Sequence, residues 1–197
     1  MKKELTLHEI QQILGYEVKI VADKPMKVLS EVPVGETFKL GDMEFIVLEH
    51  LDGTTNVLLK NFWKKCRFDN NVNNFSISEI RERLNDEFYK KVAAICGENI
   101  IPHVVDLTSD DGRKDYGKGT VRVSLLTCDL YRKYVYILDK YRPDDWWWLA
   151  TPYSTKENGY DSCVRVVNRI GALYGNRCYC NDGVRPFLTL KSSIFVS

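Results

Sequence analysis

One apolar repeat limits the folds open to this chain more than any other feature. Ser76-Ile77-Ser78-Glu79 has the spacing of a capping box, which marks the start of a helix. Beyond it, apolar residues recur every three or four positions until Gly97, at Ile77, Ile80, Leu84, Phe88, Val92 and Ile95. Such spacing places side chains on one face of an α-helix, and it predicts a helix over 77–95 with that face buried.

Local signals predict two further helices. A second capping box, Thr6-Leu7-His8-Glu9, precedes a short amphipathic pattern that Gly15 can end. The other helix is expected to begin near Thr127 and to stop before Pro143. We expect that helix to bury Leu130, Tyr134, Ile137 or Leu138, and Tyr141.

Alternating patterns predict strands on both sides of the long helix. Residues 16–22 alternate, and three strand-like runs separated by turn signals follow, at Thr37–Leu40, Met43–Glu49 and Asn56–Lys60. From Asp144 onward no helical period survives, so we expect short strands, exposed loops and a closing strand around Val184–Leu190. These patterns predict an α+β domain over 31–197, preceded by an extension over 1–30 that packs on its own domain or docks on a partner.

Composition argues against several functions. The 28 lysines and arginines nearly cancel the 27 aspartates and glutamates, so we expect no nucleic-acid partner and no membrane surface. Neither a signal sequence nor a run of 18 apolar residues is present, which predicts a protein that is not exported and does not span a membrane. The six cysteines are interpreted as reduced thiols, with Cys96 and Cys128 as small core residues.

The sequence predicts no catalytic residue, no metal site and no cofactor. Its three histidines fall in different predicted elements, and Cys178 and Cys180 are interpreted as two unrelated positions in a strand. The loop Asp106–Asp115 carries four aspartates that could bind calcium, but their spacing differs from that of the helix-loop-helix calcium motif. A solvated turn is the preferred interpretation of this loop.

Three adjacent tryptophans, Trp146-Trp147-Trp148, bring a large aromatic surface into one predicted strand. Successive side chains on a strand point to opposite faces, so two of the three rings would share a face. We expect one face to be core. The other face is either a rigid platform for a ligand or is covered by the protein's own loops.

The run Trp147-Trp148-Leu149-Ala150-Thr151-Pro152, together with Gly183-Val184-Arg185-Pro186-Phe187, resembles the ending of a family of bacterial and phage proteins. These are similar to C-type-lectin-fold domains of the formylglycine-generating-enzyme type. The resemblance covers residues 31–197 and implies short antiparallel strands, two main helices and long C-terminal loops. It also implies that Trp148 fills the core and that Arg185 ties down a loop by hydrogen bonds from its planar side chain.

A subset of this fold resembles the variable proteins of diversity-generating retroelements, which rewrite adenines near the 3′ end of one gene. Randomising both adenines of an AAY codon cannot yield Lys, Glu, Gln, Met or Trp, and none of these occurs from Asn158 to Arg185. Turn-rich β segments also favour Asn, Gly, Tyr and Asp, which offers an alternative explanation. The resemblance implies a diversified binding surface over 158–182, at Asp161, Ser162, Asn168, Arg169, Tyr174, Asn176, Arg177, Tyr179, Asn181 and Asp182.

Three functional hypotheses follow. The first is a display protein that binds a protein or surface ligand, located in the cytoplasm or on a phage particle. The second is a structural or assembly protein of a phage, in which residues 1–30 dock on a partner or on another copy of the chain. The third is an oxidase of the formylglycine-forming kind, with Cys163, Cys178 or Cys180 as redox thiols, although that family's spaced cysteine pair is absent.

Overall fold

The computed structural model describes residues 6–15 and 26–197, and the strand predicted over 16–22 lies outside these ranges. The first helix, α1 (Leu7–Leu14), begins as predicted, because the Thr6 hydroxyl accepts the Glu9 N–H and the Glu9 carboxylate accepts the Thr6 N–H. Gly15 ends the helix in the left-handed conformation, with φ at 72°. Both predicted caps of this helix are therefore confirmed.

The first sheet contains the predicted antiparallel meander. Its strands run in the order β2-β3-β4-β14-β6, and β9 pairs with β14 beside β6. Their bounds are β2 Thr37–Leu40, β3 Met43–Leu51, β4 Thr54–Leu59, β6 Ile100–Ile101, β9 Val123–Ser124 and β14 Phe187–Lys191. The closing strand thus begins three residues later than the prediction of Val184–Leu190.

A second sheet carries most of the C-terminal third, in the order β12-β11-β10-β13-β5. Its pairs are antiparallel except that of β10 with β13, which is parallel. The bounds are β5 Lys64–Cys66, β10 Trp147–Pro152, β11 Cys163–Val167, β12 Leu173–Arg177 and β13 Asp182–Val184. Short strands joined by loops are therefore present here, as predicted.

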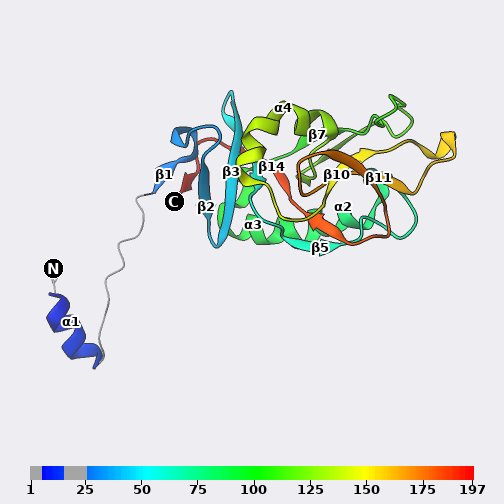
Figure 1. Ribbon diagram of the computed structural model, residues 1–197. Coiled ribbons are helices and arrows are strands. Elements are labelled where there is room, and N and C mark those ends of the chain that lie inside the picture. The colour runs from blue at the N-terminus through cyan, green and yellow to red at the C-terminus, as the bar shows by residue number, and fades with distance from the viewer. Residues whose placement is uncertain (1–5, 16–25) are drawn as a thin grey trace.

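Two short ribbons complete the strands. β7 (His103–Asp106) pairs with β8 (Lys118–Val121), and β1 (Lys27–Val28) pairs with β15 (Phe195–Val196). Figure 1 shows the β1–β15 ribbon at one end of the body, with the yellow loop after β10 at the other end. Paired structure thus begins at Lys27, inside the segment predicted as an extension.

The predicted long helix is continuous but not uniform. It consists of α2 (Glu79–Arg83), a π-helical turn η3 (Leu84–Phe88) and α3 (Tyr89–Cys96), ending at Gly97 as predicted. The buried residues are spaced by four, at Ile80, Leu84, Phe88, Val92 and Cys96. A regular α-helix would rotate this row by about 40° every four residues, and the wider π turn corrects part of that rotation.

The start of this helix differs from the prediction. Ser78 is the N-cap, its hydroxyl accepting the Arg81 N–H, so the proposed capping box from Ser76 to Glu79 is wrong. Ile77 lies in a 3₁₀ turn before the cap and is 70% exposed. Ile95 is also exposed, because Cys96 takes the buried position at the end of the row.

The helix predicted near Thr127 is α4 (Cys128–Leu138), and the Thr127 hydroxyl caps it by accepting the Leu130 N–H. It buries Tyr131, Tyr134 and Leu138. Leu130 and Tyr141, both predicted to be buried, are only half-buried. The five 3₁₀ turns of the described residues are η1 Leu29–Glu31, η2 Phe75–Ile77, η4 Gly97–Asn99, η5 Asp139–Tyr141 and η6 Lys156–Asn158.

Helices cover the strands from two sides and create two cores. Figure 1 shows α4 on one side of the strands and α2 and α3 on the other. Trp148 belongs to the core that includes α2 and α3, and Trp147 belongs to the core beneath α4. The fold is therefore α+β, with both buried tryptophans covered by the protein itself. No helix among the described residues has the length and apolarity needed to cross a membrane.

Candidate binding surface

The ten residues predicted to contact a ligand lie in the loop before β11, on the β11–β12 hairpin, in the turn after β12 and at the first position of β13. They do not share one degree of exposure. Five are exposed, namely Arg169, Tyr174, Arg177, Tyr179 and Asn181. Four are half-buried, namely Asp161, Ser162, Asn168 and Asn176, and Asp182 is buried.

The half-buried residues stabilise the loops of the segment. The Asn168 side-chain oxygen accepts the N–H groups of Ile170 and Ala172, at 3.0 and 2.9 Å, and so forms the hairpin turn. The Ser162 hydroxyl oxygen accepts an Arg177 N–H at 2.7 Å. These groups already have partners within the protein, so the predicted ligand contacts concentrate on the exposed five.

Asp182 is not the exposed position that the sequence suggested. It is only 8% exposed, and its carboxylate accepts an N–H from the Asn176 side chain at 2.8 Å. β13 lies between β10 and β5 in the sheet, which encloses its residues. Burial raises the pKa of the Asp182 carboxyl above its ordinary value, although the Asn176 hydrogen bond opposes this shift. Its role is structural.

An aromatic contact supports the exposed hairpin at one end. The Tyr174 ring meets the edge of Trp146, with centroids 5.3 Å apart. Trp146 also lines a shallow hollow of about 450 Å³ with Asn168, Arg169 and Ile170. Aromatic and arginine side chains at a partly open site are typical of residues that contribute strongly to protein binding. Trp146 was not among the predicted contact residues.

Further aromatic residues lie at the other end of β11. Tyr153 and Tyr160 are exposed with their rings 6.4 Å apart, and the Arg165 guanidinium lies 5.5 Å from the Tyr153 centroid. This second group reaches β12, because a Cβ at Gly175, the residue after Tyr174, would lie 3.7 Å from the Tyr153 ring. No spacing signal in the sequence predicts this second group, because the pairing of β10 with β11 brings Tyr153 and Arg165 together.

A buried asparagine fixes the loop that carries Tyr160. The Asn73 side-chain nitrogen lies within 3.0 Å of the carbonyl oxygens of Ser154, Tyr160 and Cys163. Its oxygen accepts the Tyr116 hydroxyl at 2.8 Å. Asn73 is completely buried, so these bonds replace water for all of its polar atoms. The sequence offers four asparagines between 70 and 74 and nothing that singles out this one.

The flanking motifs form a rigid support. Trp148 is fully buried as expected, and its indole N–H donates to the Cys66 carbonyl at 2.8 Å. Gly183 has no room for a side chain, since a Cβ there would collide with the Phe62 ring. Position 183 therefore requires glycine for close packing.

Arg185 does not anchor a loop through several hydrogen bonds, as the resemblance implied. It is fully buried, its Nε donates to the Leu59 carbonyl at 3.1 Å, and its guanidinium lies 5.0 Å from the Trp147 ring centroid. Its two terminal nitrogens have no hydrogen-bond partner among the described residues. Burial lowers the pKa of Arg185 to about 9. Stacking on Trp147 takes the place of the expected hydrogen bonds.

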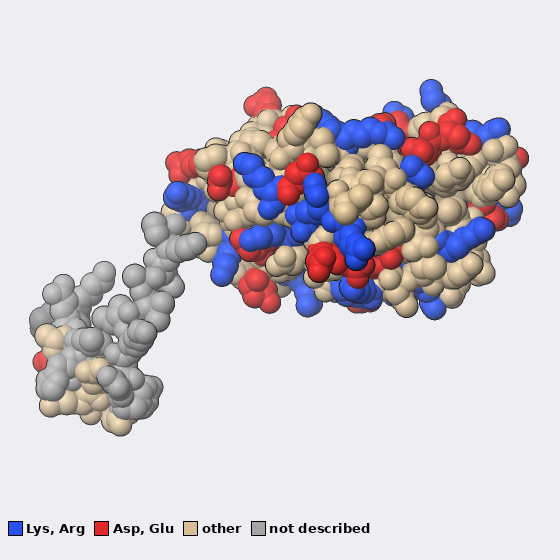
Figure 2. Space-filling view, in the orientation of Figure 1, with Lys and Arg blue, Asp and Glu red and all other residues tan. Residues whose placement is uncertain are grey.

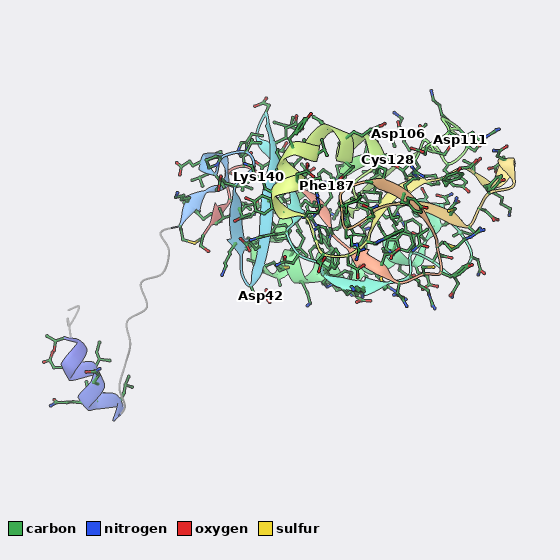
Figure 3. The ribbon with its side chains drawn as sticks, in the orientation of Figure 1. Asp42, Asp106, Asp111, Cys128, Lys140 and Phe187 are labelled. Carbon is green, nitrogen blue, oxygen red and sulfur yellow. The ribbon has the colours of Figure 1, made fainter. Side chains whose placement is uncertain are left out.

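The aspartate loop does not gather its carboxylates around a common point. Each carboxylate has its own partners. Asp106 accepts hydrogen bonds from Thr108 and Lys118, and Asp110 forms ion pairs with Arg132 and Arg165. Asp111 accepts hydrogen bonds from Ser109 and Ser154, and Asp115 accepts one from Thr155. Figure 3 places Asp106 and Asp111 at the same end of the body as Cys128 at the start of α4. In the described part of the chain, no three His, Cys, Asp or Glu side chains are placed to hold a metal ion.

All six cysteines are free thiols. Cys96 and Cys128 are buried, as predicted. Burial raises the pKa of Cys163, and it raises the pKa of Cys178 to about 11, with Asp69 adding to the effect. A raised pKa keeps these thiols protonated near neutral pH, and the protonated form is a poor nucleophile.

A cleft of about 480 Å³ separates β7 and the aspartate loop from the start of α4. His103 lines it, with Nε2 2.8 Å from the Ser124 hydroxyl and its ring against Phe187. Burial lowers the pKa of His103 to about 4, so its imidazole is neutral at pH 7. The cleft thus holds a neutral histidine beside carboxylates that already have partners, an arrangement that does not resemble an acid–base pair.

Both signs of charge are interspersed over the face of the body in Figure 2. Among the described residues, acidic and basic side chains form ion pairs, such as Lys60 with Glu44 and Lys133 with Glu49. This face therefore carries no broad field of one sign that would attract a polyanion.

Comparison with known proteins gives one match. A family described as a domain of unknown function (DUF6273) matches residues 130–192. The matched stretch includes most of α4, the strands β10 to β14 and the whole of the predicted binding segment. No curated protein and no solved structure matches the chain.

Proposed function

We propose that this protein is a ligand-binding display protein with a C-type-lectin-like fold, and that residues 158–182 form its diversified surface. The proposal includes membership among the variable proteins of diversity-generating retroelements. Its ligand would be a protein or another surface-exposed molecule, and the contacts would come from side chains rather than from a cofactor.

One observation carries the proposal. Within one short segment, the backbone is held by buried residues such as Val164, Val166 and Cys178, while Arg169, Tyr174 and Tyr179 extend outward. Tyrosine and arginine supply large contact areas, and tyrosine loses little conformational entropy when it binds. A surface of this kind can change its exposed residues without changing its fold.

The residue types that are missing add independent support. Lysine, glutamate, glutamine, methionine and tryptophan are absent from Asn158 to Arg185, although tryptophan and lysine flank this window closely. Trp146 supports the hairpin from outside the window, so the contact with Tyr174 joins a constant residue to a variable one. This division is what adenine-directed diversification of a fixed scaffold requires.

Sequencing of the flanking DNA and of sibling genes tests the proposal. We expect a reverse transcriptase gene and a near-copy of the 3′ sequence with adenines in the codons for Arg169, Tyr174, Arg177, Tyr179 and Asn181. Substitutions among siblings should concentrate at these codons and spare Trp148 and Gly183. Substitutions distributed evenly over exposed positions of the whole chain, without a near-copy, would contradict diversification.

A second candidate function is a structural or assembly protein of a phage. The observation that favours it is α1, on which Ile13 is 70% exposed and Leu14 is 45% exposed. An assembly role predicts that deletion of residues 1–25, which leaves the β1–β15 ribbon intact, abolishes incorporation into particles while the remaining domain still folds. Normal incorporation of the truncated protein would exclude this function.

A further inference from the structure

The strand β12 forms one edge of its five-stranded sheet, with β11 as its neighbour. In an antiparallel pair, every second residue directs its backbone N–H and C=O groups toward the neighbouring strand, and the residues between direct theirs away. The hairpin keeps one register throughout, and the Cys178 N–H donates to the Ser162 carbonyl at 2.8 Å. Counting back from this bonded position, Leu173, Gly175 and Arg177 direct their backbone groups away from β11.

Two of these three residues keep their backbone groups free. The Arg177 N–H donates to the Asn176 side-chain oxygen at 2.9 Å, and the Arg177 carbonyl accepts the Cys180 N–H at 2.9 Å. Within the described part of the chain, no hydrogen bond engages the outward N–H and C=O groups of Leu173 and Gly175. These groups recur about every 7 Å along the edge. An extended main chain presents donors and acceptors at the same spacing and can add to such an edge as a further strand.

Aromatic side chains lie on both faces of this edge. Tyr174 is 57% exposed and contacts Trp146 on one face. The next residue, Gly175, belongs to the opposite face, where a Cβ would lie 3.7 Å from the Tyr153 ring. Successive side chains of an added strand would therefore meet an aromatic ring on either face.

The charge around the edge is positive. Residues 162–181 contain three arginines and no lysine, aspartate or glutamate. Arg165 has an acidic partner in Asp110. Arg169 and Arg177 are exposed, and neither forms an ion pair with a described residue. A second copy of the chain would bring its own arginines against these two, whereas an acidic segment would be attracted to them.

We propose that β12 accepts an acidic, extended segment of a protein ligand, which pairs with the free backbone groups of Leu173 and Gly175 and extends the sheet. The inference rests on the proposed function, because it names the class of ligand that the same surface holds. Backbone pairing does not depend on the side chains around it, so it can persist while exposed residues vary. The acidic preference belongs to this chain, since Arg169 and Arg177 are among the positions proposed to vary.

Titration of the ¹⁵N-labelled full chain with two synthetic peptides, followed by NMR, tests the docking. Valine alternates with glutamate in one peptide and with lysine in the other. The acidic peptide should bind, shift the amide signals of Leu173 and Gly175 and slow their exchange with solvent. The basic peptide should bind at least about tenfold more weakly, because the arginines repel it. Equal affinities, no binding of either peptide, or shifts confined to residues outside β12 would overturn the proposal.

Gly175→Pro and Gly175→Ala form a matched pair of variants. Both place a Cβ 3.3 Å from the Cys163 sulfur, but only proline removes the N–H that the added strand would accept. Because that N–H is directed away from β11, proline is compatible with this edge position. Gly175→Pro should weaken binding of the acidic peptide at least about tenfold, and Gly175→Ala less than about threefold, with unchanged circular dichroism. Equal affinities of the two variants would contradict backbone pairing.

A charge reversal keeps the test independent of whether the proline variant folds. Arg169→Glu combined with Arg177→Glu leaves the backbone groups of β12 in place and should make the basic peptide the tighter ligand. An unchanged preference for the acidic peptide would show that these arginines do not select the ligand, against the proposal.

Light scattering of the free chain identifies a competing occupant. We expect a monomer. A dimer that Gly175→Pro converts to a monomer would assign the edge to a second copy and overturn the proposal. The sequences of sibling genes test diversification separately. Variation at the five exposed codons without peptide binding would remove only this inference, whereas peptide binding without variation would remove only the diversified surface.

Discussion

Tyr179 and Asp182 lie three residues apart, yet Tyr179 is 57% exposed and Asp182 is 8% exposed. The first lies in the turn after β12, at the edge of its sheet, and the second lies in β13, between two other strands. The predicted binding segment thus contains both exposed side chains and part of the scaffold that holds them. Exposure in this segment follows from the position of each strand in the sheet and not from residue type.

The difference between Tyr179 and Asp182 shows that residues that hold the fold and residues that are exposed lie within a few positions of each other in the sequence. Residues such as Asn73, Gly183 and Asp182 hold the loops and strands by buried hydrogen bonds and close packing. Tyr179 and Arg169 contribute little to that framework. Substitutions of the buried framework residues should therefore lower stability much more than substitutions of the exposed residues.

Asn73→Ala should have the largest effect. The substitution removes the side-chain amide group that donates to three carbonyl oxygens. It also removes the oxygen that accepts the Tyr116 hydroxyl. We expect the free energy of unfolding to fall by about 3 kcal/mol, measured by denaturant titration. The exposed neighbour Asn71→Ala is the control and should stay within about 0.5 kcal/mol of the wild type. Equal effects of the two substitutions would show that Asn73 is not the anchor of this loop.

Gly183→Ala should have the next largest effect, about 2 kcal/mol, because the added methyl group collides with the Phe62 ring. Gly119→Ala is a matched control, since a Cβ there meets only the Ser76 hydroxyl at 3.7 Å, an ordinary contact. Thermal unfolding followed by circular dichroism measures both variants. If Gly183→Ala were as stable as Gly119→Ala, the requirement for glycine in the scaffold would be disproved.

Asp182→Asn should change how stability depends on pH. The folded-state pKa of Asp182 lies above its ordinary value of 3.8, so the folded protein binds the proton more tightly than the unfolded chain does. This contribution to stability is fully present below pH 3.8 and is lost as pH rises through the raised pKa. Relative to Asp182→Asn, the wild type should therefore gain stability as pH falls.

Urea titrations of the wild type and Asp182→Asn at several pH values check this difference. Asp161→Asn, which makes the same substitution at a half-buried position of the same segment, is the comparison variant. A constant difference between Asp182→Asn and wild type at all pH values would mean that the Asp182 carboxyl is not held in a buried site.

Tyr179→Ala and Arg169→Ala should have the smallest effects, within about 0.5 kcal/mol, because exposed side chains without buried contacts contribute little to folding. Differential scanning calorimetry is sufficient to detect a larger change. A loss above about 1 kcal/mol at either position would place that residue in the scaffold and remove it from the proposed diversified surface.

Much of the fold follows from local signals in the sequence. The hydroxyl caps Thr6 and Thr127 and the terminal Gly97 were predictable, because a cap depends on groups within a few residues of the helix end. The meander of β2, β3 and β4 was predictable from alternating apolar and polar residues and from the turn residues between them. The true cap of the long helix was missed, since Ser76 and Ser78 carry the same hydroxyl and only packing distinguishes them.

The candidate site was less predictable than the fold. Five of the ten residues chosen from the sequence are exposed, but Trp146, Tyr153 and Tyr160 were not chosen. These three join the surface through ring contacts, such as that of Trp146 with Tyr174. Contacts of this kind depend on strand order, which residue spacing does not reveal.

The sequence by itself determined which stretches become helices and strands and that residues 158–185 lack five residue types, because both properties are local. Only the tertiary structure decided that Trp147 and Trp148 enter two different cores, that Asp182 is enclosed, and that Arg185 stacks on Trp147. Burial depends on which elements lie on each side of a strand, and that arrangement arises from contacts between residues far apart in the chain.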